Sequence, residues 1–247
     1  MHISHVSALA DNFIWMIEVD SKLVIVDPGE SKPVLEFIQQ HNFQPHAILI
    51  THHHFDHTGG ITGILKHHDL PIYGPKSETI PHLTHAISGG DTINLPDMNL
   101  NFNIIDIPGH TLGHIGYNGH NVLFCGDTLF SAGCGRVLEG TIDQMYHSLK
   151  TLSTLPDTTL IYPGHEYTLS NLAFAKSIEP DNMALLKAHQ DAENRLLRHQ
   201  ATVPTTLAYE KTINLFLRCH EPRLQTILDS NTELEAFTKL RHRKDQW

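Results

Sequence analysis

The segment THHHFDHTGG, residues 51–60, constrains this chain more than any other, because it crowds four histidines and an aspartate into six positions directly after an apolar run. Residues two apart in an extended chain point the same way, so the imidazoles of His52 and His54 can converge on one point. His53 should face away from that point. The spacing therefore predicts a shared binding site at the end of a strand.

Asp56 and His57 follow where the chain should turn into a helix, so they can aim at a second point nearby. Neutral imidazole and carboxylate are the usual protein ligands of zinc and of borderline metals such as iron and manganese. This segment, taken alone, could instead be a solvated polar loop. That alternative would not explain why three later segments place the same kinds of side chain at strand ends.

Three later segments repeat one arrangement, in which an apolar strand and a small or turn residue precede a metal-binding side chain. His110 follows a Pro-Gly turn in DIPGH, Asp127 follows a glycine in LFCGD, and His165 follows another Pro-Gly turn in IYPGH. Loops at one edge of a sheet in an α/β fold converge to form the site. We expect all these side chains to serve one metal centre.

The number of candidate ligands favours two ions, because one tetrahedral ion takes four ligands. Two ions roughly 3.5–4 Å apart commonly share a carboxylate. The predicted ligands are His52, His54 and His110 for one ion, Asp56, His57 and His165 for the other, and Asp127 as the bridge. Coordination can lower the pKa of a bridging water from about 15.7 toward about 7, which supplies hydroxide at neutral pH. Zinc is the first expectation for the two divalent ions, with iron or manganese as alternatives.

The chain should contain two domains, a mixed α+β domain over residues 1–167 and a smaller helical domain over residues 168–247. Before residue 167, short apolar runs that read as strands alternate with helical segments. We place a two-residue hairpin turn at Asn118-Gly119, because Asn-Gly suits a type I′ turn. After residue 167 four segments read as helix, at residues 170–180, 181–200, 204–220 and 232–247.

Composition excludes several classes of protein. A net charge of −10 argues against a nucleic-acid-binding surface. No stretch approaches the roughly 20 apolar residues of a membrane helix, and the amino terminus lacks a secretory pattern. Three cysteines, an odd and low number, fit a reducing compartment. We therefore expect a cytoplasmic protein without a membrane or nucleic-acid partner, and we expect a monomer.

The His-x-His-x-Asp-His segment, with its later His, Asp and His, resembles the metallo-β-lactamase superfamily. That resemblance implies an αββα sandwich with the metals at one edge. THHHFDHTGG, PGHTLGHIGY, GDTLFSAGCGR, PGHEYT and LRHRKDQW more closely resemble the segments of glyoxalase II, the hydroxyacylglutathione hydrolase family, across essentially the whole chain. The resemblance implies hydrolysis of S-D-lactoylglutathione to glutathione and D-lactate. The metal site predicted from the residues fits this reaction, with a metal-bridging hydroxide as the nucleophile and Asp56 expected to orient that hydroxide as well as bind metal.

The same resemblance implies residues that bind the carboxylates of a glutathione thioester. The residues that match the family's substrate-binding positions are Arg136, Tyr167, Arg241 and Lys244. From the sequence alone, the basic tail could instead be a solvated helix end that complements its own dipole, and Tyr167 could be a packing aromatic. Leu138 departs from the family, which often has an aromatic there, and Phe55 replaces a frequent tryptophan at an expected packing position.

Two other interpretations of the metal site stay open. One is another enzyme of the same fold, such as a persulfide dioxygenase with one iron, a lactonase or a β-lactamase. The other is a non-catalytic protein that only binds metal. Asp27, in an Asp-Pro-Gly turn, could shape that turn or orient a metal ligand.

Overall fold

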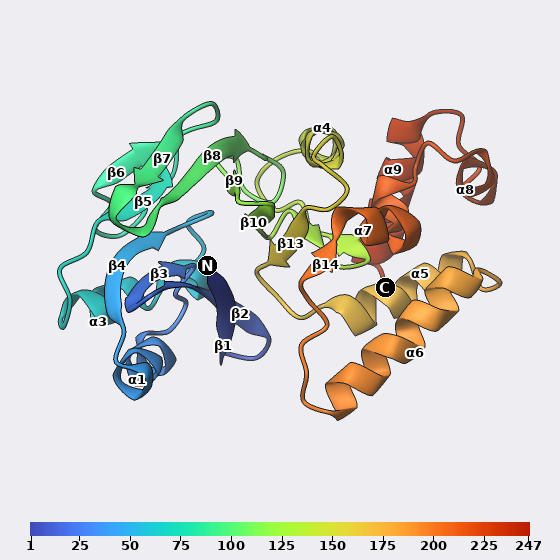
Figure 1. The fold of residues 1–247 in the computed structure, drawn as a ribbon. Helices are drawn as coiled ribbons and strands as arrows, with labels where there is room; N and C mark the ends of the chain where they lie inside the picture. The colour runs from blue at the N-terminus through green and yellow to red at the C-terminus, as the bar shows by residue number, and fades with distance from the viewer. The chain divides into compact units, whose positions relative to one another are not determined.

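The computed structural model describes residues 1–247, and the chain divides into two compact units (Figure 1). The first unit comprises Met1–Asp106 and Leu112–Gly126, and the second comprises Ile107–Thr111 and Asp127–Trp247. Residue 167 lies inside the second unit, because the preceding loops and strands contact the helices that follow. The domain division at residue 167 stays a sequence prediction.

One sheet of the first unit has its strands in chain order. They are β1 (His2–Ala8), β2 (Asn12–Val19), β3 (Lys22–Val26), β4 (Gln44–Leu49), β5 (Ile72–Pro75) and β6 (His85–Ile87). The first three are antiparallel, and β3 to β6 are parallel. The strands β1 and β6 were not predicted from the sequence.

The parallel pairing explains why ligand-type residues gather at one edge of this sheet. Val26, the last residue of β3, pairs with Leu49, the last residue of β4. Asp27 and the residues after Leu49 therefore leave the sheet together, and the Asp27 N–H donates to the Leu49 carbonyl at 3.0 Å. The carboxyl ends of parallel strands are where sites form in such sheets.

Helices cover this sheet and complete its core. These are α1 (Ser31–His41), α2 (Phe55–Thr58) and α3 (Ile61–Leu65). Val34 of α1 and Ile61 of α3 pack against Ile25 and Ile48 of the sheet, and all four side chains are buried. Helix α1 ends at His41 and is capped by Asn42, whose left-handed backbone lets its N–H bond the Ile38 carbonyl.

The second layer of the first unit consists of four antiparallel strands, which neighbour one another in the order β10, β9, β8, β7. They are β7 (Thr92–Leu95), β8 (Leu100–Asp106), β9 (Ile115–Gly119) and β10 (Val122–Gly126), with a short 3-10 helix η1 (Pro96–Met98). Buried Tyr117 of β9 joins this layer to the first sheet. Its hydroxyl donates to the Ile50 carbonyl at 2.7 Å and accepts from the Ile50 N–H at 3.2 Å.

The predicted turn at Asn118-Gly119 is wrong by two residues. Strand β9 runs through Gly119, and the two-residue turn consists of His120 and Asn121. Both have positive φ, 51° and 64°, as a type I′ turn requires. Pairing with β8 holds β9 extended through Asn118, and pairing with β10 includes Gly119, so the sheet overrides the local preference.

The second unit is mainly helical. Its elements are β11 (Leu129–Phe130), β12 (Gly133–Cys134), α4 (Ile142–Ser153), β13 (Leu160–Pro163), α5 (Thr168–Ile178), α6 (Met183–Leu197), β14 (Thr205–Thr206), α7 (Leu207–Ile213), η2 (Leu215–Leu217), α8 (Pro222–Ile227) and α9 (Glu233–Asp245). Helix α5 packs on α6, and α4 packs on α9. Helix α4 starts with a capping box between Thr141 and Gln144.

Three of the four predicted tail helices are confirmed as α5, α6 and α9. The fourth, predicted over residues 204–220, is wrong as a single helix. It begins as strand β14, and α7 stops at Asn214, whose side chain caps η2 by accepting from the Phe216 N–H. No helix in the structure has the length and apolar character needed to cross a membrane.

Candidate metal centre

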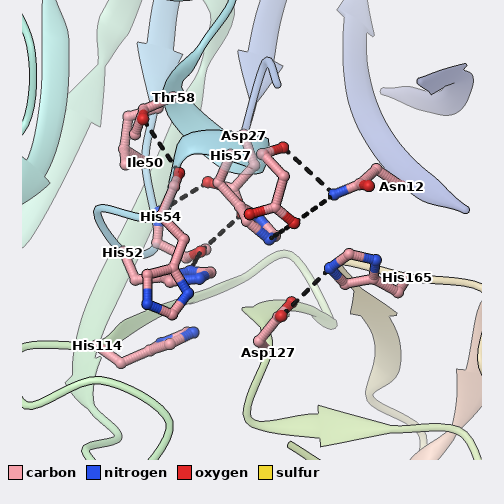
Figure 2. A network of polar contacts seen from close by, with 12 residues as sticks. Asn12, Asp27, Ile50, His52, His54, His57, Thr58, His114, Asp127 and His165 are labelled. Carbon is pink, nitrogen blue, oxygen red and sulfur yellow. Dashed lines mark hydrogen bonds and ion pairs between the residues drawn. The ribbon is translucent and has the colours of Figure 1, made fainter. Parts of the chain in front are cut away.

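The chain leaving β4 carries His52 and His54, as the sequence predicts. His52 is fully buried, and His54 is half-buried. Their ring centroids lie 4.8 Å apart, and the ring of His57 lies 4.1 Å from that of His52. Figure 2 shows these rings gathered beside Asp27. The structure thus brings the three imidazoles of the opening motif together within the first unit.

Buried Asp27 anchors this cluster. Its Oδ1 accepts the Thr51 N–H at 2.8 Å, and its Oδ2 accepts the Thr51 hydroxyl at 2.7 Å and faces His57 Nδ1 at 3.1 Å. A carboxylate only accepts, so Nδ1 carries the ring proton and Nε2 presents its lone pair. Asp27 has φ of 51°, so it forms the turn and orients His57 as well.

Asp56 belongs to the same cluster. Its Oδ2 lies 3.4 Å from His57 Nε2. Asn12, at the start of β2, donates from Nδ2 to Asp56 Oδ2 at 3.0 Å and to the Asp56 carbonyl at 3.3 Å. The sequence offered no signal for Asn12, which is 44 positions away along the chain. Its amide fixes the direction of the Asp56 carboxylate.

His53 faces a different partner, as predicted. Its Nδ1 lies 3.0 Å from Glu78 Oε2, which also accepts the His53 N–H at 2.6 Å. Glu78 Oε1 accepts the Gly113 N–H at 3.0 Å. Glu78 therefore ties His53 to the loop that precedes β9. The expected packing role of Phe55 is wrong, because its side chain is 77% exposed.

Sequence reasoning also missed His114, four positions after His110. It is fully buried, and its ring stacks on that of His52 with centroids 4.6 Å apart. Its Nδ1 lies 3.1 Å from the Ile115 carbonyl and donates to it. A side chain at Gly126 would collide with His114 and Thr51, so that position requires glycine. The signal was the second histidine of the GHTLGH segment.

The second unit holds the remaining predicted ligands together. Asp127 Oδ2 lies 3.5 Å from His110 Nε2 and 3.2 Å from His165 Nε2, and Figure 2 marks the contact with His165. His110 Nδ1 lies 2.7 Å from the Arg136 carbonyl and donates to it, so its Nε2 is presented toward Asp127. One carboxylate between two imidazoles is the arrangement expected of a bridging ligand.

Both clusters offer only imidazole nitrogen and carboxylate oxygen, which suits a divalent ion. In the first unit, ligand atoms of Asp27, His52 and His57 lie within 4.8 Å of one another. The Nδ1 atoms of His57 and His110 donate to Asp27 and to the Arg136 carbonyl, so the Nε2 lone pair of each ring is available to a metal ion. The His and Asp clusters therefore indicate divalent metal binding. Cys125, near the end of β10, is buried.

The predicted substrate-binding residues differ in exposure. Arg241 is buried, and its Nη1 donates to the carbonyls of Cys134 at 3.0 Å and Gly135 at 3.3 Å. Its Nη2 lies 2.9 Å from Asp245. Arg241 thus has a clear structural role that the sequence did not reveal.

Arg136, Lys244 and Tyr167 are more accessible. The Arg136 side chain is 63% exposed. Burial lowers the pKa of Lys244 to about 8, and the Arg241 guanidinium contributes to the lowering. Tyr167 is partly exposed and stacks on His165 with ring centroids 4.7 Å apart.

Two family models together match residues 10–247. The model described as metallo-beta-lactamase superfamily matches residues 10–165, and the model described as hydroxyacylglutathione hydrolase C-terminus matches residues 166–247. A hydroxyacylglutathione hydrolase of Aliivibrio fischeri is 46% identical over 253 residues, covering 100% of both chains. One of Nitrosomonas eutropha is 51% identical over 219 residues, covering 89% of this chain and 86% of the relative.

Solved structures confirm the predicted α+β fold of the superfamily. A metallo-beta-lactamase of Staphylococcus aureus has a TM-score of 0.68 at 20% identity, covering 97% of this chain and 66% of the other. ETHE1 from Myxococcus xanthus has a TM-score of 0.61 at 22% identity, covering 90% of this chain and 100% of the other. At these identities the likeness shows the fold alone.

We expect Asp27→Asn to weaken metal binding by about 10- to 100-fold, the usual effect of losing a group that orients a ligand. The amide would donate to His57 Nδ1, move the ring proton to Nε2 and block the coordinating lone pair. Competition of Zn²⁺ with a chromophoric chelator measures this. Asp20→Asn is the matched control, since exposed Asp20 also has positive φ, 53°. Wild-type affinity in Asp27→Asn would show that Asp27 does not orient a ligand.

Proposed function

The chain belongs to the hydroxyacylglutathione hydrolase family, and from that premise we propose that it hydrolyses S-2-hydroxyacylglutathiones, with S-D-lactoylglutathione as the expected substrate and glutathione and D-lactate as products. The observation that carries this proposal is the match to the hydroxyacylglutathione hydrolase C-terminus over residues 166–247. The superfamily match alone would leave the substrate open.

Other enzymes of the fold are less well supported. The named relatives that cover this chain at 45–51% identity are hydroxyacylglutathione hydrolases. The neighbours named metallo-beta-lactamase or ETHE1 have 22% identity or less. The hydroxyacylglutathione hydrolase C-terminus model matches residues 166–247, and this match favours that family over a persulfide dioxygenase or a lactonase.

We propose that seven side chains hold two divalent ions, with zinc first and iron or manganese as alternatives. They are His52, His54, Asp56 and His57 of the first unit and His110, Asp127 and His165 of the second. The orientation of these groups within each unit supports this assignment. A protein solved in a di-iron-bound form, 28% identical over 67% of this chain and 92% of its own length, supports the two-ion count. When bound, such ions would lower the pKa of water from about 15.7 toward about 7 and polarise a carbonyl.

Water is the nucleophile of the proposed reaction. Its oxygen forms a bond to the thioester carbon, and the bond from that carbon to sulfur breaks, so the products are a carboxylic acid and a thiol. Asp56 would orient the water, because Asn12 holds its Oδ2 in place while the carboxylate still borders His57.

Glutathione carries carboxylates, so we propose that Arg136 and Lys244 supply the positive charges that bind them and that Tyr167 contacts the substrate. Partial exposure of all three side chains supports this. Arg241 would add its charge while its N–H groups bind Cys134 and Asp245. Leu138 is 56% exposed, so it offers an apolar surface where the family often has an aromatic.

His54→Ala should reduce hydrolysis of S-D-lactoylglutathione to near the uncatalysed rate while the protein stays folded, because one ligand is lost. The assay follows thioester loss after metal-free protein is supplied with Zn²⁺, with a metal count on the same sample. Exposed His67 provides the control, and His67→Ala should behave as wild type. Wild-type hydrolysis by His54→Ala would remove His54 from the ligand set. A wild-type protein that binds two ions yet leaves the substrate intact would refute the proposed reaction.

Lys244 should make substrate capture depend on pH. With a pKa of about 8, its side chain is an ammonium ion below that pH and neutral above it. We expect kcat/KM, which reports the free enzyme, to fall about three- to tenfold through this range as a charge-assisted contact is lost. In Lys244→Arg the charge persists, so this decline should disappear.

Comparing the two proteins with one substrate isolates Lys244, because titration of the substrate affects both equally. The ratio of wild-type to Lys244→Arg kcat/KM should decline as the pH rises through 8. A ratio that is constant between pH 6.5 and pH 9.5, which spans roughly 1.5 units on either side, would exclude Lys244 from binding the substrate.

A further inference from the structure

In the chain, the short hairpin of β11 and β12 lies between Asp127, a proposed metal ligand, and Arg136, whose carbonyl orients another. Asp127 precedes its first strand, and Arg136 follows its second strand. The Arg136 carbonyl accepts from His110 Nδ1 at 2.7 Å. The Gly135 N–H donates to the Thr128 carbonyl at 3.1 Å and closes the hairpin base. The position of the hairpin therefore sets both Asp127 and the group that orients His110.

A buried carboxylate holds the turn of this hairpin. Glu210 of α7 is fully buried, and its Oε2 accepts the Ala132 N–H at 2.8 Å. Its Oε1 accepts the hydroxyls of Ser131 at 2.8 Å and Thr205 at 2.6 Å. Ala132 has φ of 57°, a left-handed backbone that L residues adopt only when other contacts stabilise it. Glu210 supplies such contacts.

Asn214, one helical turn after Glu210, joins the two strands of the hairpin. Its Nδ2 donates to the Phe130 carbonyl at 3.1 Å and the Gly133 carbonyl at 2.9 Å. The same Nδ2 lies 3.4 Å from Glu210 Oε2. The end of α7 thus bonds the backbone of both strands and of the turn between them.

Two further helices reach the same backbone. Asn171 of α5 donates from Nδ2 to the Ser131 carbonyl at 3.0 Å, and Arg241 of α9 donates to the Cys134 carbonyl at 3.0 Å. A hairpin of two-residue strands is not stable without such support. Its polar groups are satisfied by side chains from three helices of the tail, which lie 40–107 positions away in the sequence.

We propose that Glu210 is a positioning residue of the metal centre: by fixing the hairpin turn, it fixes the carboxylate of Asp127 and the carbonyl that orients His110. The helical tail would then organise part of the metal site in addition to binding substrate. This inference rests on the proposed metal centre. The alternative is that Glu210 only stabilises the tail, as any satisfied buried polar group does.

The chain contains a control residue that separates this alternative from the positioning role. Glu179 is also fully buried in the second unit, where it pairs with Arg218 at 2.9 Å and accepts from Asn182 Nδ2 at 2.9 Å. These partners lie outside the hairpin. Glu179→Met should therefore lower stability by removing one of the two carboxylates that pair with Arg218, the other being Glu221, while metal affinity stays at the wild-type value.

A neutral isostere should rescue the function of Glu210. Burial raises the pKa of its carboxyl group, against the hydrogen bonds from Thr205, Ala132, Ser131 and Asn214. In Glu210→Gln the amide oxygen can still accept from Ala132 and Asn214. The amide NH₂ can then donate to the hydroxyls of Ser131 and Thr205, because hydroxyls accept as well as donate. Glu210→Met, of similar size, can accept none of these bonds.

The test is a chelator competition with Zn²⁺ on wild-type protein, Glu210→Met, Glu210→Gln and Glu179→Met, with thermal unfolding measured on each. Absorption spectra of the Co²⁺-loaded proteins report ligand geometry. We expect Glu210→Met to bind metal about tenfold more weakly with an altered spectrum, as when a group that supports a ligand is lost. Glu210→Gln and Glu179→Met should match the wild type in both readouts.

Wild-type affinity and spectrum in folded Glu210→Met would overturn the positioning role and leave the proposed function intact. Equal weakening in Glu179→Met would also overturn it, since general destabilisation would then explain the loss. If Glu210→Met does not fold, Asn171→Ala decides the question, because it removes one bond to the hairpin and should weaken metal binding in the same direction. A wild-type protein that binds no metal would refute the proposed function itself.

Discussion

The buried carboxylate of Asp27 is the interaction on which the metal-binding edge of the first unit depends. It bonds the N–H and hydroxyl of Thr51 and the Nδ1 of His57, so it sets both the end of β4 and the tautomer of His57. The left-handed backbone at Asp27 costs about 1–2 kcal/mol. Hydrogen bonds to a charged acceptor contribute about 1.5–3 kcal/mol each and offset that cost.

In the second unit a backbone carbonyl, and not a carboxylate, orients the histidine ring. His110 is oriented by the carbonyl of Arg136, and the hairpin that carries this carbonyl is bonded by side chains of the helical tail. A tail that matches the hydroxyacylglutathione hydrolase C-terminus thus contacts the hairpin between Asp127 and Arg136. If the proposed site is correct, the same helices both bind substrate and orient metal ligands.

The strand ends and the clustering of His and Asp side chains there could be predicted, because alternation along a strand and turn residues are local signals. His52 and His54 illustrate this. The partners that hold these segments could not be predicted, because Asn12 and Glu210 act on residues 44 and 78 positions away. Local signals also failed where neighbours compete, as in the turn after β9 and in the helix that Asn214 interrupts.

We propose that seven histidine and aspartate side chains hold two metal ions. Crystals of the Zn²⁺-loaded protein, with anomalous diffraction recorded on both sides of the zinc absorption edge, test it directly. We expect two zinc peaks per chain, each within about 2.0–2.2 Å of ligand atoms of the seven residues, and Asp127 in contact with both. A single peak, or peaks bound by other residues, would contradict it.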